Sequence, residues 1–249
     1  MKTFSSRGET LAFGASEAGP YHRARHMPNA DAWMRAKGAF GDLIVVSDGV
    51  GSCPHARHGA KCACEAVVQS VKKWSKLSGG TPTELITQIE PTWQRLVLPF
   101  PPGASKATCL FALKRPDGNL LIGGLGDGMA VIKRGGEDTE WIHGQRGDNF
   151  SNNTRALGQN LQVSNWTLQD FRVTGEAIVL LATDGISDDL IPDRVDDFVI
   201  WLLEEFGAMP PLKRWHSLRR ELREWPTPHH IDDKTLVILW MKESAASHE

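Results

Sequence analysis

The sequence is poor in the features that mark several large classes of protein. It has 4 cysteines in 249 residues, a single tyrosine and a formal net charge of −2, from 28 basic and 30 acidic side chains. A balance this close to neutrality does not favour nucleic-acid binding. Hydrophobic residues make up 41% and charged residues 23%, which is typical of a folded globular chain rather than a disordered one.

Long hydrophobic runs are also missing. No stretch approaches the roughly 20 apolar residues of a membrane-spanning helix, and residues 1–19 lack the apolar run of a secretory signal. Three of the cysteines (Cys53, Cys62 and Cys64) are bunched, unlike the disulfide framework of a small secreted domain. We therefore expect a cytoplasmic protein without a membrane partner. Repeats and long linkers are absent too, so we expect one domain over residues 1–249.

Apolar patterning predicts both strands and helices. Continuous apolar runs at 43–47 and 177–183 predict strands buried on both faces. Further strands are predicted at 108–114, 120–123, 129–133, 139–143, 163–171 and 235–241. Helices are predicted at 56–77, 82–96, 195–206 and 212–225. Because the helices come in pairs rather than after every strand, a sheet-rich core with helices outside is favoured over a Rossmann arrangement. The last helix carries four arginines that we expect on a solvated face: Arg214, Arg219, Arg220 and Arg223.

Four acidic turns adjoin predicted strands. They are Asp48-Gly49-Val50-Gly51, Gly126-Asp127-Gly128, Asp184-Gly185 and Asp232-Asp233. Any one Asp-Gly pair could simply form a turn, but four beside strands favour carboxylates that converge on one cleft. Converging carboxylates repel one another, and a divalent cation reverses that penalty. An all-oxygen set of ligands suits Mg²⁺ or Mn²⁺.

The order of these turns, with the segments between them, resembles the protein phosphatase 2C family of metal-dependent phosphatases. That family carries an early Asn-x-Asp, then Asp-Gly-x-Gly, a Ser-x-Thr-like strand, a Gly-Asp-Ser/Gly turn, Thr-Arg-Ala-Leu-Gly, Thr/Cys-Asp-Gly and a final Asp-Asn/Asp-x-Thr. The corresponding segments here are Asn29-Ala30-Asp31, Ser47-Asp48-Gly49-Val50-Gly51, Ser105-Lys106-Ala107-Thr108, Gly126-Asp127-Gly128, Thr154-Arg155-Ala156-Leu157-Gly158, Ala182-Thr183-Asp184-Gly185 and Asp232-Asp233-Lys234-Thr235. They span nearly the whole chain, and the ordered set is more specific than any single segment.

The resemblance implies a fold, a reaction and a partner. The implied fold is α+β, a four-layer α-β-β-α sandwich of two mainly antiparallel sheets flanked by helix pairs. The implied activity is that of a serine/threonine protein phosphatase, in which metal-activated water hydrolyses phosphoserine and phosphothreonine. The implied cofactors are two Mg²⁺ or Mn²⁺ ions with a weaker third. The implied partner is a phosphorylated protein, the product of a serine/threonine kinase in signalling, and we expect the phosphatase to be a monomer.

The resemblance also assigns metal ligands. Asp48 would bridge two ions, and the carbonyl of Gly49 would bind the second of them. Asp184 and Asp232 would bind the first ion. Asp127 would help Asp184 to hold the third.

Other residues are implied in catalysis, and here the sequence departs from the family. Asp31, with Asp48, is the implied catalytic residue, because it would position metal-bound water. Many relatives have an acidic ligand of the second ion where Ala30 stands. Relatives often carry an arginine that grips the phosphate, and Arg23 and Arg25 are the candidates here. Two alternatives therefore stay open: a catalytically weak regulatory or scaffold protein of the same fold, and a phosphatase of small phosphate esters.

Three further features of the sequence lie outside these segments. A Cys/His patch comprises Cys53, His55, His58, Cys62 and Cys64. Its spacing matches no usual zinc pattern, so we expect buried or half-buried helix residues rather than a zinc site. The pair His229-His230 either lines the metal cleft or lies exposed in a loop. The polar segment 144–153 is a candidate for a mobile flap.

Overall fold

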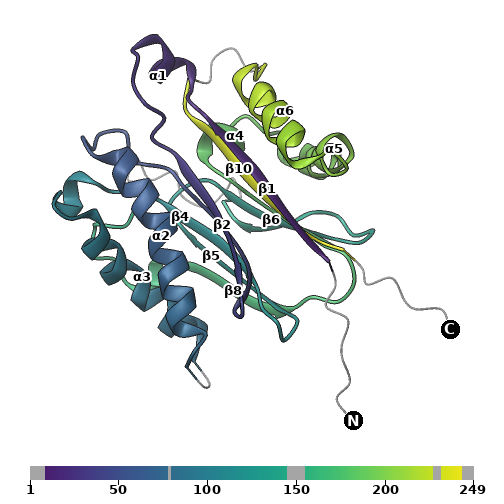
Figure 1. The fold of residues 1–249 in the computed structure, drawn as a ribbon, viewed down its shortest axis with the longest axis horizontal. Coiled ribbons are helices and arrows are strands. Elements are labelled where there is room, and N and C mark those ends of the chain that lie inside the picture. The colour runs from purple at the N-terminus through teal and green to yellow at the C-terminus, as the bar shows by residue number, and fades with distance from the viewer. Residues whose placement is uncertain (1–8, 78–79, 145–154, 227–230, 243–249) are drawn as a thin grey trace.

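Two antiparallel five-stranded sheets lie face to face in the computed structural model, which describes residues 9–77, 80–144, 155–226 and 231–242 (Figure 1). The first sheet has the order β1 (Thr10–Glu17), β10 (Lys234–Met241), β9 (Ala177–Ala182), β6 (Met129–Arg134) and β7 (Glu140–His143). The second has the order β2 (Ala32–Gly38), β3 (Gly41–Ser47), β4 (Cys109–Lys114), β5 (Asn119–Leu125) and β8 (Thr167–Arg172).

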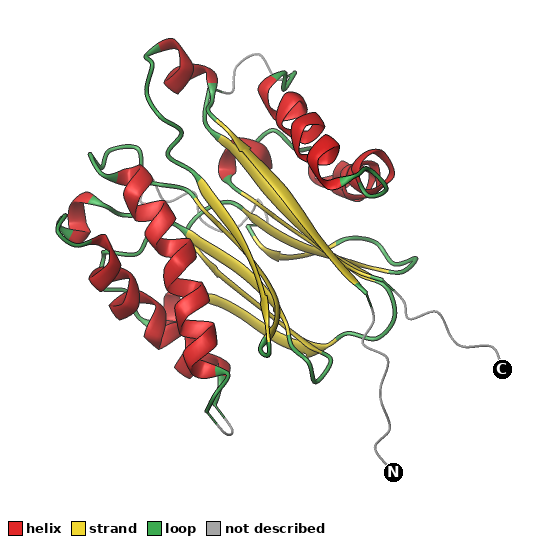
Figure 2. Ribbon diagram, viewed as in Figure 1, coloured by secondary structure: helices red, strands yellow, loops and turns green. Residues whose placement is uncertain are grey.

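Helices cover the outer face of each sheet (Figure 2). The pair α2 (Ala56–Trp74) and α3 (Pro82–Val97) packs on the second sheet, and the pair α5 (Val195–Phe206) and α6 (Pro211–Arg223) packs on the first. The shorter helical elements are α1 (Pro20–Ala24), α4 (Asp184–Ser187) and 3₁₀ helices at Pro102–Ala104, Val163–Asn165 and Pro192–Arg194. The predicted α+β four-layer sandwich is therefore confirmed. Within the described ranges, every helix is too short or too polar to cross a bilayer.

Strand β3 shows why the central strands are apolar throughout. Ile44 and Val46 lie in the core between the two sheets, whereas Leu43 and Val45 lie in the core beneath α2 and α3. Successive side chains of a strand point to opposite faces. A strand between another sheet and a helix layer must therefore be apolar at every position.

Most of the predicted elements are confirmed. The eight predicted strands correspond to β3 to β10, and the four predicted helices correspond to α2, α3, α5 and α6. Strands β1 and β2 and the short helices α1 and α4 were not predicted. The strand prediction at 163–171 is wrong at its start, because Val163–Asn165 forms a 3₁₀ helix. There the backbone N–H of Gln162 donates to Asn165 Oδ1 at 2.8 Å, so the strand begins at Thr167.

The prediction of a solvated arginine face on α6 is wrong for Arg214. This side chain is 7% exposed, and its guanidinium donates to the carbonyls of Phe206, Gly207 and Met209 at 2.8, 3.0 and 2.6 Å. The last carbonyls of a helix have no partner within that helix. Arg214 supplies the donors that the end of α5 needs, and it fastens α5 to α6.

Helix α2 lies very close to the loop that precedes β4. A Cβ atom placed on Gly59 would lie 1.7 Å from the carbonyl oxygen of Ser105. The indole of Trp93 in α3 donates to the Gly59 carbonyl at 3.0 Å, and the N–H of His55 donates to the Ala104 carbonyl at 3.0 Å. Gly59 thus sets how close α2 comes to this loop.

Replacing Gly59 with alanine is expected to destabilise the protein. The new methyl group would collide with backbone, which cannot rotate away, and overpacking of this kind costs about 1–3 kcal/mol. Thermal unfolding should show a melting temperature lower by about 2–4 °C for each kcal/mol of lost stability in a chain of this length. Gly103→Ala is the matched control, because a Cβ at Gly103 meets nothing within 4 Å. Equal melting temperatures for the two variants would contradict the close approach.

Candidate metal centre

The predicted acidic turns gather at one end of the paired sheets, near α1 and α4 (Figure 1). Asp48 follows β3, and Asp127 lies in the turn between β5 and β6. Asp184 is the first residue of α4 after β9, and Asp232 precedes β10. These strands belong to both sheets, so the site forms only where the two sheets meet.

Three carboxylates form a tight group. Each of Asp48, Asp127 and Asp184 offers an oxygen, and these oxygens all lie within 4.8 Å of one another. The group does not include Asp232, whose side chain is exposed but which still raises the pKa values of Asp48 and Asp184. Three half-buried carboxylate oxygens at this spacing fit a hard divalent cation such as Mg²⁺ or Mn²⁺.

Asp48 and Gly49 are held by the segment that enters β4. The N–H of Asp48 donates to Thr108 Oγ1 at 2.8 Å, and the N–H of Thr108 donates to the Asp48 carbonyl at 2.8 Å. Gly49 then forms an isolated β-bridge with Ala107. A Cβ on Gly49 would lie 2.5 Å from the backbone of Ala56, so only glycine lets the start of α2 come this close.

The turn that carries Asp127 is fixed by a histidine that sequence reasoning missed. Gly126 and Gly128 flank Asp127 with φ values of 101° and 97°, in the left-handed region that favours glycine. His143 Nε2 lies 2.9 Å from the Gly126 carbonyl, and its Nδ1 lies 2.8 Å from Thr167 Oγ1. His143 is in β7 and Thr167 in β8, so this ring joins the two sheets beside the acidic turn.

Asp184 is placed by the tight start of α4. The N–H of Gly185 donates to Asp184 Oδ1 at 2.7 Å, and Lys234 Nζ donates to the Gly185 carbonyl at 2.9 Å. A Cβ on Gly185 would lie 1.8 Å from the Asp233 carbonyl oxygen. The turn at Asp184 therefore packs directly against the segment that carries Asp232.

Asp31 lies behind the group of three. It is 6% exposed, and its Oδ2 accepts a hydrogen bond from Thr183 Oγ1 at 2.8 Å. Burial is the largest cause that raises the pKa of Asp31, to about 6, and the charge of Asp233 raises it further. The hydrogen bonds to Asp48, Thr235 and Thr183 act in the opposite direction.

The pKa values of the clustered acids are raised for the same reasons. Burial raises the pKa of Asp184 to about 8, and the charges of Asp127, Asp232 and Asp31 add to the effect. Burial, followed by the charges of Asp31 and Asp184, raises the pKa of Asp48 well above its usual value. Without a cation this site therefore favours protonated acids, and a divalent ion would replace those protons.

A second buried aspartate organises the segment before β2. Asp233 is 1% exposed and accepts hydrogen bonds from the N–H groups of Gly19 and Ala30 at 2.7 and 2.6 Å. His22 Nδ1 lies 2.7 Å from Asp233 Oδ2. Sequence reasoning did not single out His22, because 211 residues separate it from Asp233.

Comparison with known proteins supplies the family. A model of the protein phosphatase 2C family matches residues 18–225. The chain belongs to the protein phosphatase 2C family. No match was found among curated protein sequences. Family and fold together support a metal-dependent phosphatase, and the structure contains a group of acidic side chains that could hold a metal ion.

Solved structures of the family share the fold. RsbX in complex with magnesium is 11% identical with a TM-score of 0.59, covering 94% of this chain and 96% of that one. The catalytic domain of the serine threonine protein phosphatase PstP, in complex with two manganese ions, is 19% identical with a TM-score of 0.60, covering 92% and 97%. PppA of Pseudomonas aeruginosa is 17% identical with a TM-score of 0.65, covering 94% and 98%.

The two candidate phosphate-binding arginines both have partners within the protein. Arg23, in α1, donates through Nη1 to the Ala18 carbonyl at 3.0 Å. The guanidinium of Arg25 lies 3.8 Å from the centroid of the Tyr21 ring. A role for either in binding phosphate stays a prediction.

Ala30, at the position where the resemblance implies an acidic ligand in many relatives, makes a small apolar contact. Ala30 is 8% exposed and clusters with Cys53 and Ala56, and Val50 packs against them. These residues therefore add no carboxylate on the Ala30 side of the site.

The Cys/His patch is largely packed into the fold. All four cysteines of the chain are buried and free, and Cys62 Sγ lies 3.5 Å from His58 Nε2 and 3.4 Å from the Leu96 carbonyl. The ring of His55 stacks on Phe100 with centroids 3.9 Å apart. The expectation of helix residues holds for His58, Cys62 and Cys64 in α2, whereas Cys53 and His55 lie in the turn before that helix. His229 and His230, and residues 145–153 of the candidate flap, lie outside the described residues.

Replacing Asp184 with asparagine is expected to stabilise the metal-free protein at alkaline pH. A folded-state pKa of about 8, above the ordinary value of 3.8, means that ionisable Asp184 destabilises the fold above about pH 4, by an amount that grows with pH until about pH 8. The amide side chain in Asp184→Asn would keep the Oδ1 acceptor for Gly185 and remove the charge. Thermal unfolding in chelator should show the variant melting several degrees higher than wild type at about pH 8.5, with the gap narrowing as the pH falls and closing only near about pH 4.

Adding Mn²⁺ to the same thermal unfolding measurements tests whether Asp184 binds the cation. The cation should raise the melting temperature of the wild type and raise that of the variant less, since the variant lacks one ligand. Asp193→Asn removes an exposed aspartate and is the control. A variant that melts below wild type in chelator at every pH would contradict the repulsion described here.

Proposed function

We propose that this protein is a Mg²⁺- or Mn²⁺-dependent serine/threonine protein phosphatase. The observation that carries the proposal is the group of Asp48, Asp127 and Asp184 at the junction of the two sheets of a protein phosphatase 2C fold. Its substrate is a phosphoprotein made by a serine/threonine kinase. We further propose that it acts as a cytoplasmic monomer in signalling.

The chain offers several oxygen ligands for such ions. Asp48, Asp127, Asp184 and Asp232 would supply carboxylates, and Gly49 would supply its carbonyl oxygen. When bound, two divalent ions make hydroxide available from water near neutral pH and neutralise the charge that develops on the phosphoryl oxygens.

Asp31 is suited to orient the attacking water. The hydroxyl of Thr183 donates to Asp31 Oδ2 at 2.8 Å and holds the carboxyl group in place. This arrangement supports attack by water without a covalent intermediate.

The cysteines do not support the alternative chemistry of a thiolate nucleophile. Burial raises the thiol pKa values of Cys62, Cys64 and Cys109 above the ordinary value, so these thiols stay protonated at neutral pH. Cys53 is buried as well.

A catalytically weak regulatory or scaffold protein is the second candidate. The observation that favours it is Ala30, which packs with Cys53 and Ala56 where many family members have an acidic ligand. Titration calorimetry with Mn²⁺ separates the two candidates. Tight binding of two ions supports the phosphatase, and failure to bind a second ion supports the alternative.

Hydrolysis of a phosphothreonine peptide with added Mn²⁺ tests the proposed activity. We expect turnover that chelator abolishes and that Asp184→Ala lowers by about 100-fold or more, because loss of a metal ligand removes several kcal/mol of transition-state stabilisation. A small phosphomonoester assayed in parallel would show whether peptide substrates are preferred. Asp193→Asn should retain wild-type turnover. Activity that survives chelator or Asp184→Ala would contradict the proposal.

A further inference from the structure

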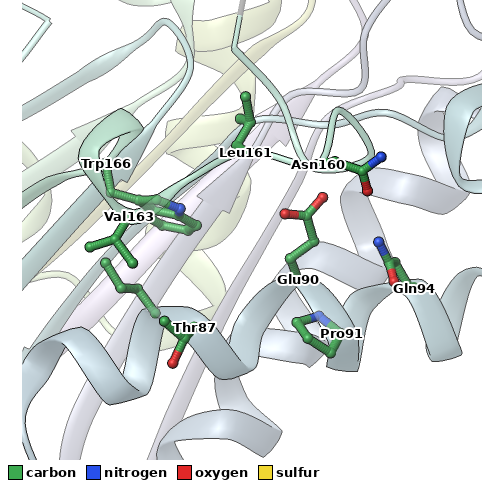
Figure 3. A pocket seen from close by; sticks show the side chains of 9 residues that line it. Thr87, Glu90, Pro91, Gln94, Asn160, Leu161, Val163 and Trp166 are labelled. Carbon is green, nitrogen blue, oxygen red and sulfur yellow. The ribbon is translucent and has the colours of Figure 1, made fainter.

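A cavity of about 320 Å³ opens between α3 and the segment that leads into β8 (Figure 3). Thr87, Glu90 and Gln94 line it from α3, and Leu161 and Trp166 line it from the facing segment. This volume is at the lower end of the range for ligand pockets, about 300–1,000 Å³. Neither the acidic turns nor the Cys/His patch contributes to it.

The cavity has an apolar side and a polar side. Trp166 and Val163 lie at one end in Figure 3, and the carboxylate of Glu90 points into the space beside Asn160 and Leu161. Glu90 is the one charged side chain among the described residues that line the cavity. A long side chain with an apolar stem and a cationic head, such as lysine or arginine, matches this division.

Contacts within the protein hold the walls of the cavity in place. Glu90 Oε1 accepts a hydrogen bond from the N–H of Gly158 at 3.1 Å, which orients the carboxylate. The Trp166 ring packs against buried Phe111, with centroids 6.4 Å apart. A preformed wall lowers the entropic cost of binding.

The wall opposite α3 continues directly from the metal centre. The Arg155 carbonyl oxygen lies 2.8 Å from where a Cβ of Gly126 would be, beside Asp127. Leu157 forms a β-bridge with Ala107, which in turn bridges Gly49. From residue 155 to residue 160 the chain takes five steps, which span at most about 18 Å. An extended peptide of about five to eight residues could therefore reach from the metal centre into the cavity.

We propose that this cavity binds a lysine or arginine side chain of the phosphoprotein substrate, about five to eight residues from the phosphorylated residue. The aliphatic stem lies against Trp166 and Val163, and the cationic head pairs with Glu90. The inference rests on the proposed phosphatase function, and it adds a determinant of substrate choice outside the metal centre.

Matched phosphothreonine peptides test it. Each pair is identical except for arginine or glutamine at one position, five to eight residues before or after the phosphothreonine. We expect wild type to show a KM about three- to ten-fold lower for arginine at the favoured spacing, with similar kcat, as a partly desolvated charge pair would give. In Glu90→Gln, which keeps the acceptor for Gly158, the KM ratio of the two peptides should fall to one.

The ratio of two peptides separates docking from a structural effect. A general defect in the Glu90→Gln protein would change both KM values together, whereas loss of docking changes only the arginine peptide. Glu84→Gln is the control on the same helix, because glutamine can also complete the capping box with Thr81. It should keep the wild-type ratio.

Two results would overturn the docking proposal: equal KM values for the peptides at every spacing in wild type, or a preference for arginine that persists in Glu90→Gln. If wild type with Mn²⁺ hydrolyses neither peptides nor a small phosphomonoester, the proposed function fails. Calorimetry with the unphosphorylated arginine and glutamine peptides then decides docking without turnover. Binding of the arginine peptide that Glu90→Gln weakens supports the pocket, and equal binding of both peptides overturns it.

Discussion

The repulsion among converging carboxylates is the constraint around which this fold is built. Asp48, Asp127 and Asp184 have oxygens within 4.8 Å of one another, although burial and mutual charge raise the pKa values of Asp48 and Asp184. Their turns adjoin strands of both sheets, so the acids can come together only if the sheets pack. The apolar core between the sheets, which includes Ile44 and Val179, therefore keeps together carboxylates that would otherwise move apart.

Hydrogen bonds between segments that are distant in the sequence also hold the two sheets together near the acidic side chains. Thr183, after β9 of one sheet, donates to Asp31, which precedes β2 of the other. Asp233, at the start of β10, accepts from Ala30 beside Asp31. These contacts cross from sheet to sheet at the end where the acids lie, so the packing of the sheets and the geometry of the site depend on each other. His143 makes the same kind of link beside Asp127.

Local signals explain what the sequence could predict. The central strands and the Asp-Gly turns are visible because runs such as 43–47 are apolar at every position and end in a turn residue. Strands β1 and β2 lie at the edges of their sheets, are only partly buried and include small residues such as Gly14. The pairing of His22 with Asp233 could not be predicted from spacing, because only the folded chain brings residues 211 positions apart together.

The side of the site around Ala30 follows the same electrostatic logic. Asp31 already lies beside the charges of Asp48 and Asp233, and Asp233 raises its pKa. An acidic side chain at position 30, as in many family members, would add another negative charge to this group. Alanine there adds no such repulsion to the metal-free fold and, under the proposed function, also lacks the carboxylate that a second ion would use. A carboxylate at position 30 would produce both the repulsion and the metal ligand, so a substitution there changes the two effects together. The stability of the metal-free protein and its affinity for a second ion are therefore coupled through position 30.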